Sequence, residues 1–230
     1  MNRCGAARPR DSGCGWVYIK GVNDVLAHLS RLEERLGQVW PDQVYAFDLA
    51  CVERQWPIYE RSARGRPWDR SAALRGGIDA MWDWLRGAAQ PRGFAAVCAE
   101  AVFSDTTGGR PDLTYKTVND AEVHALFFVL HLVDLMESIE EERPEECVIW
   151  VRRTLDVVDS FISDYDYPGP NTTADYDALV DQHPLMRNAM DQQNADLALV
   201  TRTAEVASII DQLRVQTSSQ SILTDRWFPT

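Results

Sequence analysis

Five polar residues that could do chemistry fall within one apolar stretch of the sequence: Asp120, His124, His131, Asp134 and Ser138. Their spacings of four, seven, three and four place them along one face of a helix expected over Asp120 to Glu141. His131 and Asp134 could share a metal ion whose further ligands come from neighbouring helices. His124 cannot join them, because seven residues separate it from His131 by about 10.5 Å along the axis. A metal-dependent enzyme is one hypothesis, and the polar edge of an otherwise buried helix is the interpretation that the pattern favours.

Directly after that stretch comes the densest charge cluster of the chain. Its members are Glu140, Glu141, Glu142, Glu145 and Glu146. Pro144 suits the first turn of a new helix, so the cluster is expected at the junction between two helices. A run of like charges is usually a solvated face. At a junction it also forms a compact negative knob that suits a basic partner.

A second candidate binding segment is the acidic, Tyr- and Pro-rich connection expected over 164–181. Its candidate partner-binding residues are Asp164, Tyr165, Asp166, Tyr167 and Tyr176. Tyrosine is enriched in the cores of protein interfaces. The carboxylates and Gly169 are partly spaced as in a calcium-binding loop, but Pro168 stands where a ligand belongs. A solvated turn is favoured over a calcium site.

Helical periodicity recurs along the rest of the chain, whereas strand signals are scarce. The sequence predicts an all-α fold, a single compact multi-helix bundle of about seven helices. The bundle is expected over 22–217, between a disordered leader at 1–21 and a C-terminal tail at 218–230. Pro57 is expected to break or kink the second helix. One helix is expected from Pro144 through Ile162, and one long last helix from Pro184 through Ala207.

The charge of the chain indicates which classes of partner it can bind. The formal net charge is −12 at pH 7. Residues 1–92 carry 14 Lys and Arg against 11 Asp and Glu, whereas residues 93–230 carry 9 against 24. The acidic field of the second half repels phosphate backbones and anionic lipids, so neither nucleic acid nor a membrane is expected as a partner. A basic protein would be attracted, although the same charge also serves solubility.

Cysteine usage and the hydrophobic segments predict a cytoplasmic protein. The five cysteines include no Cys-x-x-Cys pair, and Cys51, Cys98 and Cys147 lie in apolar helical patterns typical of buried small hydrophobes. The longest apolar run, Leu126 to Met136, is too short to span a membrane. His28 and His183 are expected in capping or surface positions. Phosphate-binding loops and nucleophile elbows are absent from the sequence, so no cofactor and no catalytic residue are expected.

One stretch carries a family pattern. It combines Ala50-Cys51, Glu53-Arg54, Pro57 and Tyr59, followed by the helix that bears Trp82, and later by Pro184 and Asp191 to Gln193. In these residues the chain resembles the YjaG-like family of uncharacterised all-helical bacterial proteins, a domain of unknown function. The resemblance implies a compact all-α fold and brings no activity, cofactor or catalytic residue. The chain departs from the family at Asn194, where an aromatic residue is expected. Arg54 and Gln193 are interpreted as hydrogen-bonded polar groups among packed helices.

These observations favour a non-catalytic cytoplasmic binding protein whose acidic second half docks a basic protein. An immunity protein that neutralises a basic toxin is one form of this hypothesis. Two alternatives stay open: the metal-dependent enzyme around His131 and Asp134, and a self-associating regulatory protein that forms a homo-oligomer.

Overall fold

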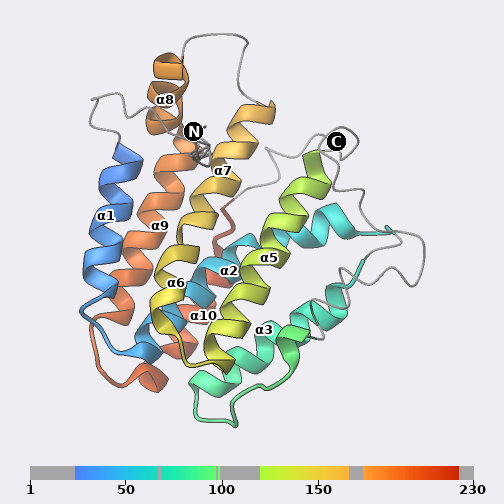
Figure 1. Ribbon diagram of the computed structural model, residues 1–230, viewed down its shortest axis with the longest axis vertical. Helices are drawn as coiled ribbons and strands as arrows, with labels where there is room; N and C mark the ends of the chain where they lie inside the picture. Colours follow the sequence, from blue (N-terminus) through green and yellow to red (C-terminus); the bar gives the residue numbers. More distant parts are fainter. Residues whose placement is uncertain (1–23, 67–68, 97, 99–119, 166–172, 223–230) are drawn as a thin grey trace, which may run out of the picture.

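Nine α-helices and one short 3-10 helix, with further helical residues at 94–96 and 98, make up the part of the chain that the computed structural model describes (Figure 1). That part comprises residues 24–66, 69–96, 98, 120–165 and 173–222. The bounds are α1 (Asp24–Leu36), α2 (Pro41–Ala63), α3 (Ser71–Leu85), α5 (Asp120–Glu140), α6 (Pro144–Trp150), α7 (Arg152–Tyr165), α8 (Thr173–Gln182), α9 (Pro184–Val200), η1 (Val206–Ser208) and α10 (Ile210–Ser219). No strand occurs among these residues, and the all-α prediction is confirmed.

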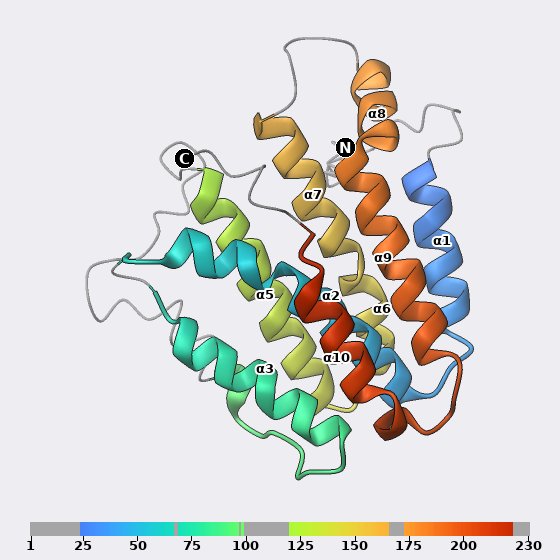
Figure 2. The ribbon, with the colours of Figure 1, turned by 180° about the vertical axis from the view of Figure 1, so that it is seen from behind.

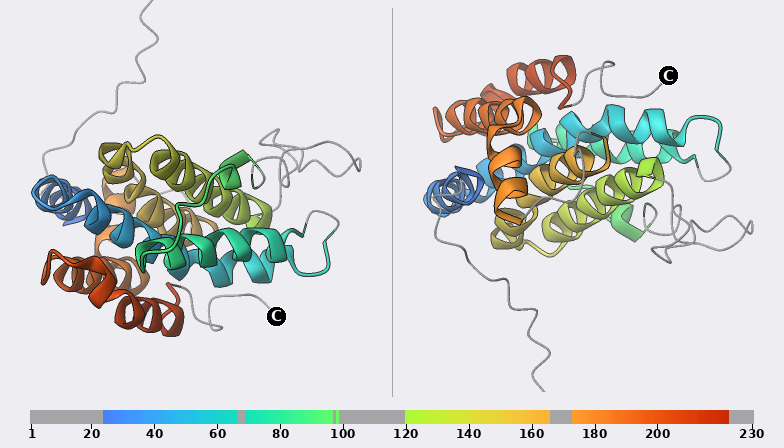
Figure 3. Two further views of the ribbon diagram at one scale, coloured as in Figure 1. Left: turned by 90° about the horizontal axis from the view of Figure 1, so that it is seen from below. Right: turned by 90° about the horizontal axis from the view of Figure 1, so that it is seen from above.

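α2 is the central helix of the bundle. It packs against α3, α5, α6, α9 and α10. Figure 3 shows α5 on one side of it and α9 with α10 on the other. Every residue from Gln43 to Gln55 is buried, which requires side chains that are apolar on all faces or that find polar partners.

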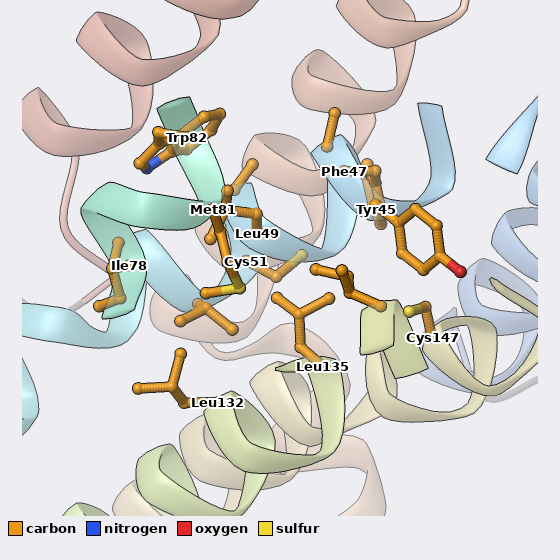
Figure 4. Packing of buried hydrophobic residues seen from close by; sticks show 14 of the residues in the cluster. Tyr45, Phe47, Leu49, Cys51, Ile78, Met81, Trp82, Leu132, Leu135 and Cys147 are labelled. Carbon is orange, nitrogen blue, oxygen red and sulfur yellow. The ribbon is translucent and has the colours of Figure 1, made fainter. Parts of the chain in front are cut away.

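Two apolar clusters fill the bundle. The larger joins α2, α3 and α5, and Figure 4 shows Leu49 and Cys51 of α2 close to Met81 of α3 and Leu135 of α5. The smaller gathers side chains of α1, α7, α8 and α9. Within the described segments, no helix combines the length and the apolar character that crossing a bilayer would need.

Two expected helix ends differ in the structure. α2 continues past Pro57 to Ala63, because the residues after the proline, Ile58 and Tyr59, are anchored in the core and hold the last turns in place. The helix expected from Pro144 through Ile162 is instead two helices that meet at Val151. The carbonyl of Val151 accepts a hydrogen bond from Gln193 Nε2 of α9 (3.2 Å). This backbone group therefore has a partner in another helix at the point where α6 ends and α7 begins.

The C-terminal third also contains more separate helices than the apolar spacing predicted. The connection expected over 164–181 contains a helix, α8, whose apolar side packs on the smaller cluster. The expected last helix ends at Val200, where Gln43 Nε2 donates to the carbonyls of Val200 (2.6 Å) and Thr203 (2.7 Å). Ala204 and Ala207, which continue the apolar spacing, are exposed. The chain then turns through η1 so that α10 packs against α2 and α3 (Figure 2).

Candidate functional site

The buried polar side chains of α2 reach toward several neighbouring helices. Arg54 lies with Asp196 of α9, Nε to Oδ2 at 2.8 Å and Nη2 to Oδ1 at 2.7 Å, and both side chains are at most 1% exposed. Gln216 Nε2 adds a donor to Asp196 Oδ1 at 2.9 Å, and Arg54 Nη1 donates to the carbonyl of Gln220 at 2.8 Å. The interpretation of Arg54 as a hydrogen-bonded group among packed helices is confirmed.

His131 of α5 is part of a second buried pair. It is fully buried, and its Nε2 donates to Asp48 Oδ1 at 2.7 Å. Gln55 Nε2 contacts His131 Nδ1 at 2.8 Å and also donates to the carbonyl of Cys51 at 3.2 Å. The same Gln55 nitrogen lies 3.0 Å from Thr154 Oγ1, so Gln55 links α2 to both α5 and α7. His131 is therefore held inside the core through both of its ring nitrogens.

Both residues of the hypothesised metal site at His131 and Asp134 already have partners within the protein. Asp134 Oδ2 lies 2.8 Å from Arg153 Nη2 of α7, and the Arg153 guanidinium in turn lies 4.3 Å from the Trp150 ring. Burial raises the pKa of the Asp134 carboxyl, and the Arg153 charge offsets this only in part. Across the described residues, no group of three His, Cys, Asp or Glu side chains is placed to bind a metal.

The polar residues of α5, interpreted from the sequence as the polar edge of an otherwise buried helix, are themselves mostly buried. His124, His131 and Ser138 are buried, and only Asp134 is partly exposed. The described part of α5 packs against both α2 and α7. The side chain of Asp120 lies outside the described part.

The other histidines divide between the core and a helix cap. His28 is buried, contrary to expectation, and its Nε2 donates to Gln193 Oε1 at 2.9 Å. Burial lowers the pKa of His28, which keeps the imidazole neutral. His183 caps α9 as expected, since its Nδ1 accepts from the amide of Leu185 at 3.2 Å.

Cys51, Cys98 and Cys147 are buried free thiols, as predicted. Burial raises the pKa of Cys51 and Cys147, and it raises the pKa of Cys98 to about 11. A protonated, buried thiol is neither a nucleophile nor a metal ligand. These cysteines therefore act as small packing residues.

The glutamate cluster lies where α5 turns into α6. Arg143 pairs with Glu141 (2.6 Å) and with Glu146. Glu140 is half-buried, and its Oε1 accepts from the Ala95 amide at 3.4 Å. Glu142 and Glu145 are exposed, and within the described residues no basic side chain pairs with either.

α6 packs against α2, whose first turn holds a further carboxylate, Asp42. Burial raises the pKa of the Tyr45 phenol, and nearby negative charges, Glu145, Glu142 and Asp42 among them, raise it further. Tyr45 itself is buried, and its hydroxyl donates to the carbonyl of Ser138 at 3.2 Å. Asp42 is exposed. We call the surface formed by Asp42, Glu141, Glu142, Glu145 and Glu146 the acidic end.

The acidic end carries two large apolar side chains. Trp40 is 67% exposed and directly precedes α2, two residues before Asp42. Ile149 is 62% exposed and follows Glu145 by one helical turn of α6. Sequence reasoning missed Trp40, Asp42 and Ile149. The one available signal was the Trp-Pro pair, because a residue that precedes a first-turn proline lies outside the helix and its side chain often faces solvent.

The tyrosine-rich segment lies at the opposite end of the bundle, so the structure does not join it to the glutamates (Figure 1). Asp164 and Tyr165 end α7, where Asp164 lies 3.5 Å from His124 and Tyr165 stacks on Phe161. Tyr176 belongs to α8, not to a loop. It is half-buried, and its hydroxyl donates to Asp159 Oδ1 at 2.7 Å. Asp166 and Tyr167 lie outside the described residues.

Comparisons with known proteins place the chain in a family. A family described as "Protein of unknown function (DUF416)" matches residues 31–222. The chain belongs to the DUF416 family. A solved structure of a DUF416 family protein from Shewanella baltica OS155 is similar in fold at 17% sequence identity, with a TM-score of 0.65 over 84% of this chain and 98% of that one. No curated protein matches the sequence.

The DUF416 match includes all of the buried polar pairs on α2 as well as the acidic end. It extends to residue 222, and the residues after α10 contact α2: the Ile222 amide donates to the Arg54 carbonyl at 3.4 Å. The family description assigns no activity, so any function rests on the chemistry of the surfaces described above.

Proposed function

We propose that this DUF416 protein is a non-catalytic cytoplasmic binding protein that docks a basic protein partner on its acidic end. The observation that carries the proposal is that Glu142 and Glu145 are exposed without a basic partner among the described residues, beside the start of α2 with its exposed Asp42, against which α6 packs. Exposed carboxylates without intramolecular cations keep their charge available to a partner.

The net charge of the turn supports a basic partner. Residues 140–146 hold five glutamates and a single arginine, so the segment carries about four negative charges at neutral pH. Arg143 is already occupied by Glu141 and Glu146. Such a concentrated field accelerates the encounter with a positive surface and weakens as salt screens it.

The interior supports a binding role over catalysis. His131, Asp134, His28 and Cys147 are the groups with the clearest capacity for acid–base or nucleophilic chemistry. Each is buried or tied to a side chain of another helix, as described above. Side chains that are held by such contacts stabilise the packing of the helices. The charges that a partner can reach lie on the surface.

In its finer form, the proposal is an immunity protein that neutralises a basic toxin. The likeness to the YjaG-like proteins stays a prediction beside it and adds no activity. Asp164 and Tyr165, exposed at the end of α7, stay a proposed second contact surface, at the opposite end of the bundle from the acidic end.

The test is salt-dependent co-purification of the full-length protein from its native host, with the recovered protein identified by mass spectrometry. We expect a basic protein that is retained at about 50 mM salt and released at about 300 mM, where the Debye length is roughly halved or less. The double variant Glu142→Gln/Glu145→Gln should lose this partner without loss of thermal stability, because both side chains are exposed.

The matched control is Glu60→Gln/Asp191→Asn. It removes the same charge from exposed positions on the second half of α2 and on α9, away from the acidic end. The control should keep the partner. Equal retention by both double variants, or a partner without excess positive charge, contradicts the proposed site.

A further inference from the structure

We propose that Trp40 is the anchor of the acidic end and that its exposed indole stacks against an arginine of the basic partner. This inference rests on the proposed function and names the residue type that the site recognises. An exposed tryptophan is costly to leave in water, and a single aromatic residue often supplies much of the energy of an interface.

The backbone of Trp40 is held in place from both sides. Its amide donates to Gln43 Oε1 at 2.8 Å, and its carbonyl accepts from the amides of Gln43 (2.9 Å) and Val44 (3.2 Å). Gln43 is buried, and its Nε2 binds the end of α9 through Val200 and Thr203. The next residue, Pro41, fixes the start of α2. Trp40 is therefore pre-organised, so binding through its ring would not require the backbone to be ordered first.

The charges near Trp40 decide which group should meet its ring. Asp42 lies two residues away, and α6, which contains Glu145 and begins just after Glu142, packs against both α1 and α2, the helices on either side of Trp40. On the side of α1 and α9, Arg35 donates to Thr201 and Arg202 donates to Gln212, and both guanidinium groups keep their charge. The carboxylates of Asp42, Glu142 and Glu145 outnumber these two cations, so a cation from the partner is favoured near Trp40.

Arginine fits this position better than lysine. A guanidinium is planar, stacks on an aromatic face and can at the same time donate to carboxylates at its edge. An ammonium is a strongly hydrated point charge and makes the carboxylate contacts alone. The structure already contains the intramolecular version of this contact, since the Arg153 guanidinium lies 4.3 Å from the Trp150 ring while it pairs with Asp134.

The experiment uses the full-length protein and two labelled peptides of equal length and equal net charge, one built on arginine and the other on lysine. Dissociation constants are measured by fluorescence anisotropy at low salt. We expect wild type to bind the arginine peptide more tightly. Trp40→Ala should weaken the arginine peptide about two- to fivefold, the range of an exposed cation–π contact, and should remove the preference over lysine. Trp40→Phe should keep part of that preference.

Two further variants separate this inference from the proposed function. Val215→Ala removes an equally exposed apolar side chain from α10 and should change nothing. Glu142→Gln/Glu145→Gln should weaken both peptides alike and keep the preference for arginine. If that double variant weakens both peptides while Trp40→Ala changes neither, the role of Trp40 is refuted and the acidic end stands. If neither peptide binds wild type, the proposed function fails.

Self-association is the remaining outcome for an exposed tryptophan, and sedimentation velocity measures it. We expect wild type and Trp40→Ala to sediment identically at the peptide-binding concentrations. A dimer that dissociates on Trp40→Ala would assign the indole to a second copy of this chain and overturn the arginine assignment.

Discussion

Asp196→Asn is expected to destabilise the fold strongly, because it removes the charge opposite the buried guanidinium of Arg54. The two side chains make paired contacts of 2.7 and 2.8 Å at no more than 1% exposure. An asparagine has nearly the same shape, but its amide nitrogen would place a donor against an Arg54 donor. Removing one partner of a buried ion pair costs about 3–5 kcal/mol, a large part of the roughly 5–15 kcal/mol that stabilises a typical protein.

The assay is urea unfolding followed by circular dichroism, with the free energy extrapolated to water. The double variant Arg54→Met/Asp196→Leu is the decisive comparison. It removes both charges, and apolar side chains of similar volume often restore stability where a single removal does not. We therefore expect the double variant to be more stable than Asp196→Asn alone. Measured with Arg54→Met and Asp196→Leu as the matching single changes, the cycle should give a coupling of at least about 1 kcal/mol.

A loss below about 1 kcal/mol for Asp196→Asn would refute the reasoning, since that is the range of a solvated surface pair. A double variant whose loss equals the sum of the losses of its single changes would show that the two side chains are not coupled, so the cost of Asp196→Asn would not come from leaving Arg54 unpaired. Gln216→Leu is a milder companion change, because it removes one donor to Asp196 and keeps the ion pair.

Three further predictions concern single side chains in the core and on α3. Burial lowers the pKa of His28 in the folded state, so the free energy of unfolding should fall as the pH drops below the unfolded pKa of 6.5. The slope should reach up to about 1.4 kcal/mol per pH unit. His28→Gln should remove this contribution in urea titrations between about pH 7 and pH 5. Gly76→Ala should raise stability by about 1 kcal/mol because its Cβ enters open space, whereas Gly77→Ala should raise it less, because its Cβ requires the terminal methyl of a buried methionine of α5 to shift; thermal melts of the pair would show equal shifts if the packing argument is wrong. In native protein at pH 8 a thiol reagent should modify no cysteine once Cys4 and Cys14 are replaced by serine, and mass spectrometry of labelled protein checks this.

The spacing of apolar residues was sufficient to predict the all-α fold class, because helical periodicity depends only on residues that are close in sequence. The stripe of Leu29, Leu32 and Leu36 is buried as its spacing predicts. Helix ends were predicted less well, because partners far away in sequence decide them. The break at Val151 involves Gln193, and the end of α9 at Val200 involves Gln43. No local pattern contains those contacts.

The candidate site shows the same division between local and distant information. The exposure of Glu142 and Glu145 follows from the charge run itself and agrees with the structure. Asp42 stands about a hundred residues earlier, and only the packing of α2 against α6 brings it to the same surface. The partner of His131 could not be predicted for a related reason. Asp48 lies 83 residues earlier in the sequence, and its carboxylate accepts the hydrogen bond that the buried imidazole needs.

The buried pairs on α2 also explain why one helix can be central to this bundle. A helix that is apolar on every face could slide or rotate among its neighbours with little change in contact area, because apolar contacts have no direction. Asp48, Arg54 and Gln55 bind different helices through directional contacts, so a rotation of α2 would leave charges unpaired in the core. The cost of that mismatch fixes the register of α2, and with it the position of Trp40 and Asp42 at the helix start. The geometry of the proposed binding surface is therefore set by the buried charges of α2.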